Sequence, residues 1–251
     1  PYITAVSAGA CNILSYMSNQ PLRTRRIIEN YVTDKRYFSL KNWMEKGSIF
    51  GFDFIFEDLP KTLLPFDFET YYNYPGILQV GTTDCRSGQS VWFGKEAIGN
   101  SFLPVRASAS LPFLAPIVHI GSRDLLDGAL VAPIPYEKAQ EAGYKKFIIV
   151  LTRNSGYRKK KSVPQILLKT WYKDYPKLWE IMQQRPELYN KQLEYVEQLE
   201  KDGKAVIIRP QIPLEIDRLD IKPDKLLGLH DHGIGCGLEA YDKIINLINS
   251  K

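Results

Sequence analysis

The sequence is poor in the residues that build covalent or metal-bound frameworks. Its 251 residues include three cysteines, which are Cys11, Cys85 and Cys236, and no C-x-x-C pair. This count excludes a disulfide framework, gives no zinc signature and favours a reducing compartment. There are three histidines, and His230 and His232 are only two positions apart. Two histidines at that spacing do not share a helix face, and no third ligand is near, so we expect no metal and no other cofactor.

Long hydrophobic runs are absent as well. Residues 1–22 carry no charged side chain, but they contain six serine, asparagine and glutamine residues. A stretch this polar cannot form a helix that crosses a bilayer. We therefore expect no transmembrane segment and a cytoplasmic location, with contact to a membrane limited to its surface.

The excess of one charge sign is small. The formal net charge of +5 is too low over this length to indicate a nucleic-acid-binding protein. Residues 153–177 hold eight basic side chains and one acidic one. Two interpretations of this basic stretch remain open: a solvated basic face, and peripheral contact with an anionic membrane. The second would use Arg158, Lys159, Lys160 and Lys161.

What the sequence does contain predicts a folded α/β protein. Hydrophobic residues make up 44% and charged residues 24%, as is usual for globular chains. Residues 2–6 predict a buried strand, and residues 8–17 predict a helix directly behind it. Residues 77–93 and 117–126 each resemble a hairpin, and residues 147–151 predict another buried strand. From about residue 163 long amphipathic helices are expected, with one strand at 205–208.

Four phenylalanines alternate with other residues at positions 50, 52, 54 and 56. The period of two favours a strand or loop that contributes aromatic side chains to the core. An acyl-binding or membrane-facing lip is the alternative.

Ser7 occupies the position that a nucleophilic serine would need. It lies in the pattern Ala5-Val6-Ser7-Ala8-Gly9, between the predicted buried strand and the predicted helix. Small residues on both sides permit a sharp turn that exposes the serine hydroxyl at a helix N-terminus. The helix dipole and free N–H groups favour negative charge there. The alternative is simply a helix that starts with small residues.

A serine nucleophile needs a base, and the sequence offers two kinds. His119 lies in an apolar strand and is better explained as a structural histidine, whereas His230 and His232 lie in a separate C-terminal segment. Asp127, followed by Gly128 and Ala129, comes at the end of a predicted strand, where its carboxylate could project toward the sheet edge. A desolvated aspartate gains basicity and can accept a serine proton. A plain Asp-Gly turn is the alternative.

These residues together resemble the patatin-like phospholipase family. The resemblance is carried by Val6 to Ala10, by the segment RASASLPF at 106–113 and by Leu126 to Ala129. The tail, including residues 186–195 and 206–210, is similar to the helical extension of a bacterial branch of the family.

The resemblance implies a three-layer sandwich with a mainly parallel central sheet in residues 1–155, and a mostly helical C-terminal extension in residues 156–251. It also implies a Ser-Asp dyad hydrolase of lipid acyl esters, with Ser7 as nucleophile and Asp127 as base. Ala5 stands where the family's elbow usually has glycine. The family's glycine-rich oxyanion loop has no counterpart, since the chain has no Gly-Gly pair, and we expect this loop to precede Pro1.

Two other functions also fit the sequence. One is a Ser-His-Asp α/β-hydrolase that uses Ser7, Asp127 and His230 or His232, because this chain order also occurs in that fold. The other is a non-catalytic lipid-binding protein that has lost its oxyanion loop.

Overall fold

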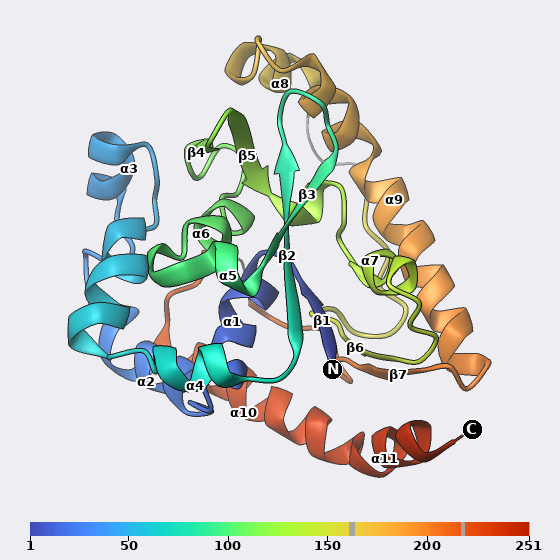
Figure 1. Cartoon of the computed structure of the whole chain (residues 1–251). Coiled ribbons are helices and arrows are strands. Elements are labelled where there is room, and N and C mark those ends of the chain that lie inside the picture. Colours follow the sequence, from blue (N-terminus) through green and yellow to red (C-terminus); the bar gives the residue numbers. More distant parts are fainter. Residues whose placement is uncertain (161–163, 217–218, 251) are drawn as a thin grey trace.

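The computed structural model of the chain describes residues 1–160, 164–216 and 219–250. Helices surround a five-stranded sheet and a separate two-stranded sheet (Figure 1). The strands are β1 (Tyr2–Ala5), β2 (Ile77–Asp84), β3 (Ser90–Gly94), β4 (Val118–Ile120), β5 (Arg123–Asp127), β6 (Phe147–Val150) and β7 (Ala205–Ile208). The helices are α1 (Ala8–Met17), α2 (Arg23–Tyr31), α3 (Leu40–Lys46), α4 (Phe68–Asn73), α5 (Lys95–Ile98), α6 (Leu103–Ser108), α7 (Tyr136–Glu141), α8 (Gln165–Trp171), α9 (Pro176–Lys201), α10 (Pro223–Glu239) and α11 (Tyr241–Asn249). A π-helix, η1 (Phe54–Leu63), and two 3-10 turns, η2 (Gly99–Ser101) and η3 (Gly128–Leu130), complete the elements.

The large sheet brings the ends of β1 and β5 together on one edge of β2. β3 pairs with Gln79 to Thr83 of β2, so the opposite edge of β2 must hold its other two neighbours. β1 runs parallel along the first half of that edge, ending with Ala5 opposite Val80. β5 runs antiparallel along the second half, ending with Asp127 opposite Thr82. The residues that follow β1 therefore meet the last residue of β5.

The expectation of a mainly parallel sheet was wrong. In the described part of the chain β1 and β2 are the parallel pair of the large sheet, whereas β2–β3, β2–β5 and β4–β5 are antiparallel. The reason is local, because 77–93 and 117–126 form the two predicted hairpins, and a tight turn can only join antiparallel strands. The sheet is mixed.

Helical segments pack on both faces of this sheet. On one face Ala5, Leu78 and Val80 pack with Leu14 of α1 and Val105 near the middle of α6. On the other face Leu126 packs with residues of α8 and α9. Successive side chains of a strand point to opposite faces, so β5 sends Leu126 toward α9 and Leu125 toward α6.

The phenylalanine-rich segment contributes to the core, but as a helix. Phe52, Phe54 and Phe56 are buried, and Phe50 is half-buried. Phe52 and Phe56, four residues apart, pack in the core cluster beside α1, whereas Phe54 packs against Tyr31 of α2. The strand or loop predicted from the period of two was therefore wrong, and the aromatic core that it predicted is confirmed.

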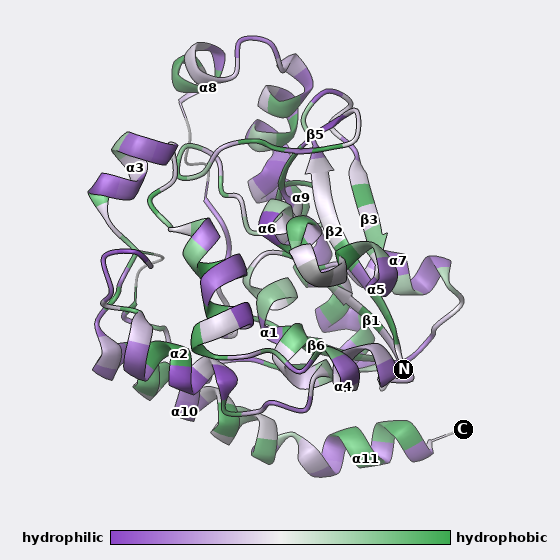
Figure 2. Ribbon diagram, turned by 60° about the vertical axis from the view of Figure 1, so that its left-hand side comes forward, coloured by the Kyte–Doolittle hydropathy of each residue, from purple (hydrophilic) through white to green (hydrophobic). Residues whose placement is uncertain are grey.

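The C-terminal half is largely helical and shares its core with the N-terminal half. β6 pairs in parallel with β7, and both pack under α7 and α9. The strand predicted at residues 147–151 is present as β6, but only one of its faces is buried, since Ile148 and Val150 are exposed. α10 and α11 cross the end of the molecule where Pro1 lies, and hydrophobic and hydrophilic residues alternate along them (Figure 2). The boundary near residue 155 stays a prediction.

No described helix is both long enough and apolar enough to span a bilayer.

Candidate active site

Ser7 sits in a strained turn between β1 and α1. Its backbone has φ 54° and ψ −130°, a region that residues with a side chain rarely adopt. Such a conformation costs about 1–3 kcal/mol and persists where the surrounding structure enforces it. The strand–turn–helix arrangement predicted from the small residues around Ser7 is present.

The Ser7 hydroxyl is directed at Asp127. Its Oγ donates a hydrogen bond to Oδ2 of Asp127 over 2.6 Å. A serine at the first position before a helix usually caps the helix with its hydroxyl, but the Ser7 side chain makes no capping bond to α1. The amides of Ala8 and Gly9 belong to the first turn of α1, where backbone N–H groups have no helical acceptor. Ser7 therefore faces a carboxylate on one side and a helix N-terminus on the other.

The Asp127 carboxylate is buried and held in place from several sides. The residue is only 1% exposed. Its Oδ1 accepts a hydrogen bond from the Ala129 amide over 2.7 Å, so that Asp127 caps the 3-10 turn η3. Its own amide donates to the Ser110 carbonyl, and its carbonyl accepts from the Thr83 hydroxyl. Both carboxylate oxygens are thus engaged, one by the turn and one by Ser7.

Gly128 is required because two backbones touch behind the turn. A Cβ at this position would lie 2.1 Å from the Gly81 carbonyl oxygen and 2.9 Å from Val6. No side chain fits at that distance from a backbone atom of β2. Gly128 therefore lets the turn pack directly against β2, beneath Ser7.

The other residues of the predicted motif have different environments. Ala5 is buried at the end of β1 and packs in the core beside α1, so its extra methyl group has room. Ala8 and Gly9 are exposed, and a Cβ at Gly9 would meet no atom within 4 Å. The space at Gly9 therefore does not require glycine.

Cys11 lies one helical turn beyond Ser7, with its amide donating to the Ser7 carbonyl. Burial raises the pKa of its thiol to about 12, and the Asp127 carboxylate adds to this shift. The thiol is therefore neutral at ordinary pH and is a poor nucleophile.

The comparison with protein families covers the region that carries Ser7 and Asp127. The model of the patatin-like phospholipase family matches residues 1–139, more than half of the chain. The chain belongs to the patatin-like phospholipase family. Residues 175–249 match a second family, DUF6363, a domain of unknown function.

A relative of this patatin-like protein occurs in Escherichia coli (strain K12). It is the uncharacterized protein YjjU, with 25% identity over 159 residues. The match covers 58% of this chain and 42% of YjjU, so the chain spans less than half the length of that relative.

Ser108 contacts Ser7 in this patatin-like protein, but it was not predicted from the sequence as a residue of the site. Its hydroxyl, at the end of α6, accepts from the Ser7 amide over 2.8 Å and donates to the Gly81 carbonyl over 2.7 Å. Ser108 and Ser110 are fully buried. The signal in the sequence was the pair of serines in the stretch RASASLPF, but the sequence did not indicate what they contact.

The histidines of this patatin-like protein have partners other than the two proposed dyad residues. His119 Nδ1 lies 2.7 Å from Asp124, and His230 Nδ1 lies 3.2 Å from Asp231. His232 approaches Cys236 on α10. The position beside the Ser7 hydroxyl is taken by Asp127 itself.

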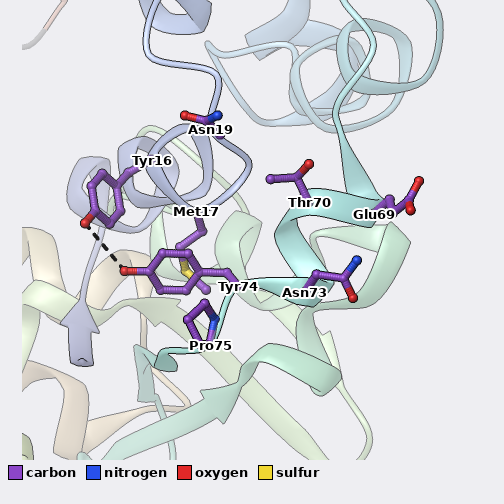
Figure 3. A pocket seen from close by; sticks show the side chains of 8 residues that line it. All are labelled: Tyr16, Met17, Asn19, Glu69, Thr70, Asn73, Tyr74 and Pro75. Carbon is purple, nitrogen blue, oxygen red and sulfur yellow. Dashed lines mark hydrogen bonds between the residues drawn. The ribbon is translucent and has the colours of Figure 1, made fainter.

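An open depression of about 480 Å³ lies near the other end of α1 (Figure 3). It is lined by Tyr16, Met17, Asn19, Glu69, Thr70, Asn73, Tyr74 and Pro75. Since α1 has ten residues and rises about 1.5 Å per residue, this depression is roughly 15 Å along the helix from Ser7. In this patatin-like protein the depression is therefore separate from Ser7 and Asp127.

The basic stretch is only partly available for contact with a surface. Arg158 pairs with Glu197 of α9 over 3.0 Å, and the Lys159 side chain lies over the Tyr189 ring. Lys160 is exposed. Lys161 lies outside the described residues.

Proposed function

We propose that this protein hydrolyses acyl esters of lipids with Ser7 as nucleophile and Asp127 as general base. The observation that carries the proposal is the 2.6 Å hydrogen bond from the Ser7 hydroxyl to the buried Asp127 carboxylate, made by a serine in a strained turn at a helix N-terminus. Membership of the patatin-like phospholipase family supports lipid acyl esters as the substrate class.

The reaction proceeds through an acyl-enzyme. Ser7 Oγ attacks the ester carbonyl carbon while Asp127 Oδ2 takes the hydroxyl proton. The tetrahedral intermediate collapses, the bond to the alcohol oxygen breaks, and Asp127 returns the proton to the leaving alcohol. Water then attacks the acyl-Ser7 ester with Asp127 again as the base, which releases the fatty acid and restores the Ser7 hydroxyl. The N-terminus of α1 favours the negative charge that develops at the carbonyl oxygen in both steps.

The test is ester hydrolysis by Ser7→Ala and Asp127→Asn beside the parental chain. General base catalysis is worth roughly 10²–10⁴-fold, so each change should lower turnover of a short-chain ester by at least about a hundredfold while circular dichroism and melting stay near parental values. An organophosphonate should label Ser7 and no other serine. A loss below about tenfold for either variant would refute the dyad, and a parental chain without turnover or labelling would favour the non-catalytic alternative.

The basic stretch supports a second part of the proposal, peripheral binding to anionic membranes. The exposed Lys160 and the neighbouring Arg158, Lys159 and Lys161 would attract acidic lipid headgroups, and salt would screen this attraction over about 8–10 Å. Binding to vesicles that contain phosphatidylglycerol should fall as salt rises. Exchanging these four residues for glutamine should weaken it, whereas Lys201→Gln with Lys204→Gln should not. Equal, salt-independent binding to neutral vesicles would contradict this part.

A further inference from the structure

One face of α9 follows β5 from the start of the strand to the turn after Asp127. Next to the start of the strand, the Tyr175 hydroxyl donates to Oδ2 of the buried Asp124 over 3.1 Å. Beyond the end of the strand, Arg185 Nε donates to the Ala129 carbonyl over 2.8 Å. The C-terminal region therefore makes hydrogen bonds to both ends of the segment that carries Asp127.

The lengths of the two elements match between these contacts. Tyr175 is the residue directly before α9, and Arg185 lies ten positions further on, which is about 15 Å along a helix. From Asp124 to Asp127 the strand rises about 10 Å, and Ala129 lies two residues further on in the 3-10 turn η3, which adds about 4 Å. The helix and the strand can therefore lie side by side over the whole interval.

Apolar side chains fill the interval. Leu178 and Met182 of α9 belong to the same buried cluster as Leu126 and Leu130. Positions 178, 182 and 185 are spaced by four and three residues, so they share one face of α9, and Tyr175 directly precedes the helix. One continuous face of α9 thus contacts β5 and η3.

That face contacts the back of the strand, and Asp127 is on its front. Asp124 and Leu126 point to α9, whereas Leu125 packs against Ala107 of α6. Asp127 alternates with Leu126 and sends its carboxylate to Ser7. Any shift of β5 away from α9 would therefore move the carboxylate relative to the serine.

Ala129 links Arg185 to the carboxylate. Its carbonyl accepts from Arg185, and its amide donates to Asp127 Oδ1 over 2.7 Å. η3 is a single 3-10 turn of three residues, an element with poor hydrogen-bond geometry of its own. The hydrogen bond from the charged Arg185 on α9 stabilises this turn from outside.

We propose that α9 positions the Asp127 carboxylate for proton transfer, with Arg185 as the positioning residue. The match to DUF6363 begins at Tyr175, which makes the first of these contacts. Positioning Asp127 would therefore be a role for a domain of unknown function. The proposal rests on the function proposed above, in which Asp127 is the base.

The experiment compares Arg185→Ala and Arg185→Lys with Arg209→Gln. Arg209 is a matched control, since it is a half-buried arginine of the same region that pairs with Glu197 and Glu200 near the other end of α9. Three experiments are done on each full chain: steady-state kinetics with a p-nitrophenyl ester, which gives kcat and KM, hydrogen exchange of residues 123–132, and thermal melting.

Arg185→Ala should lower kcat by about ten- to a hundredfold with KM nearly unchanged, because misplacement of a catalytic group by about 1 Å can cost 10²-fold. Amides of residues 127–131 should exchange faster. Arg185→Lys keeps a cationic donor and should recover most of kcat. Arg209→Gln should lower the melting temperature without changing kcat by more than about threefold.

A purely structural role gives a different result. The proposal is overturned if Arg185→Ala lowers the melting temperature as Arg209→Gln does, but leaves kcat and the amide exchange rates of residues 127–131 at parental values. If the parental chain has no turnover, the proposed function fails, and the exchange measurement still decides whether Arg185 holds the turn. Should Arg185→Ala fail to fold, Tyr175→Phe removes the hydrogen bond to Asp124 at the start of β5 and is studied by the same three experiments.

Discussion

The side-chain oxygen of Ser108 lies 2.8 Å from the backbone nitrogen of Ser7. The same hydroxyl donates to the Gly81 carbonyl on β2, the atom against which Gly128 packs. The buried Ser108 hydroxyl therefore links the strained turn at Ser7 to β2, and the turn after Asp127 packs against the same strand. Both turns contact β2 at Gly81, which fixes their relative positions.

Removing the Ser108 hydroxyl should loosen this arrangement. Ser108→Ala leaves a buried carbonyl and the Ser7 amide without their partner, a cost of about 1–3 kcal/mol. Ester turnover should fall at least tenfold, and the melting temperature should drop by a few degrees. Ser110→Ala is the matched control, because Ser110 is equally buried but its hydroxyl donates to the Arg106 carbonyl, four residues earlier in the chain. Equal loss of turnover in both variants would show that the bridge has no special role.

Two glycines of the predicted motif should respond oppositely to a methyl group. Gly128→Ala places a carbon 2.1 Å from the Gly81 oxygen, so the turn must move, and the free energy of unfolding should fall by about 1–3 kcal/mol or more. Gly9→Ala meets open space near the start of α1, where alanine is the better helix former, so melting should stay level or rise. Thermal melts of both variants check this. A Gly128→Ala protein as stable as the parent would contradict the close contact.

Histidine exchange separates the dyad from a triad. Each histidine has a partner outside the proposed dyad, so His119→Gln, His230→Gln and His232→Gln should each keep at least about a tenth of parental turnover, which corresponds to no more than ~1.4 kcal/mol in barrier. Steady-state hydrolysis by each folded variant is the measurement, with melting recorded separately because His119 contacts Asp124. Loss of turnover in a normally melting His230→Gln or His232→Gln protein would favour the triad.

Asp124 should make stability depend on pH in the acid range. Burial alone would raise its pKa, but hydrogen bonds from His119, Tyr175 and Arg86 outweigh burial and hold the pKa below its usual value. A carboxyl with a lowered pKa stabilises the fold above its unfolded pKa of about 3.9, and this contribution disappears as pH falls through the folded value.

The parental protein should therefore be more stable than Asp124→Asn near pH 6–7, with the difference shrinking below about pH 4. Denaturant melts from pH 3 to 7 measure this, and the exposed Asp242→Asn is the control. A difference that is constant over the whole range would mean that the ionised carboxylate adds nothing.

The sequence by itself determined the local features of the candidate site. The small residues around Ser7 predicted a strand, a sharp turn and a helix, because each depends on neighbours within a few positions. The turn residues Asp84 to Gly88 and Gly121 to Asp124 predicted both hairpins for the same reason. The turn after residue 126 offered Asp127 as one possible base, and the resemblance to the family paired it with Ser7.

The tertiary structure alone decided which distant residues hold the site together. Ser108 meets Ser7 across 101 positions, and Arg185 meets Ala129 across 56. Such contacts depend on strand register and on helix packing, which no local pattern encodes. The meeting of Ser7 and Asp127 has the same cause, because β1 and β5 lie along one edge of β2 and their ends face each other. The sequence predicted a nucleophile and a base, and only the fold decided which buried groups fix the distance between them.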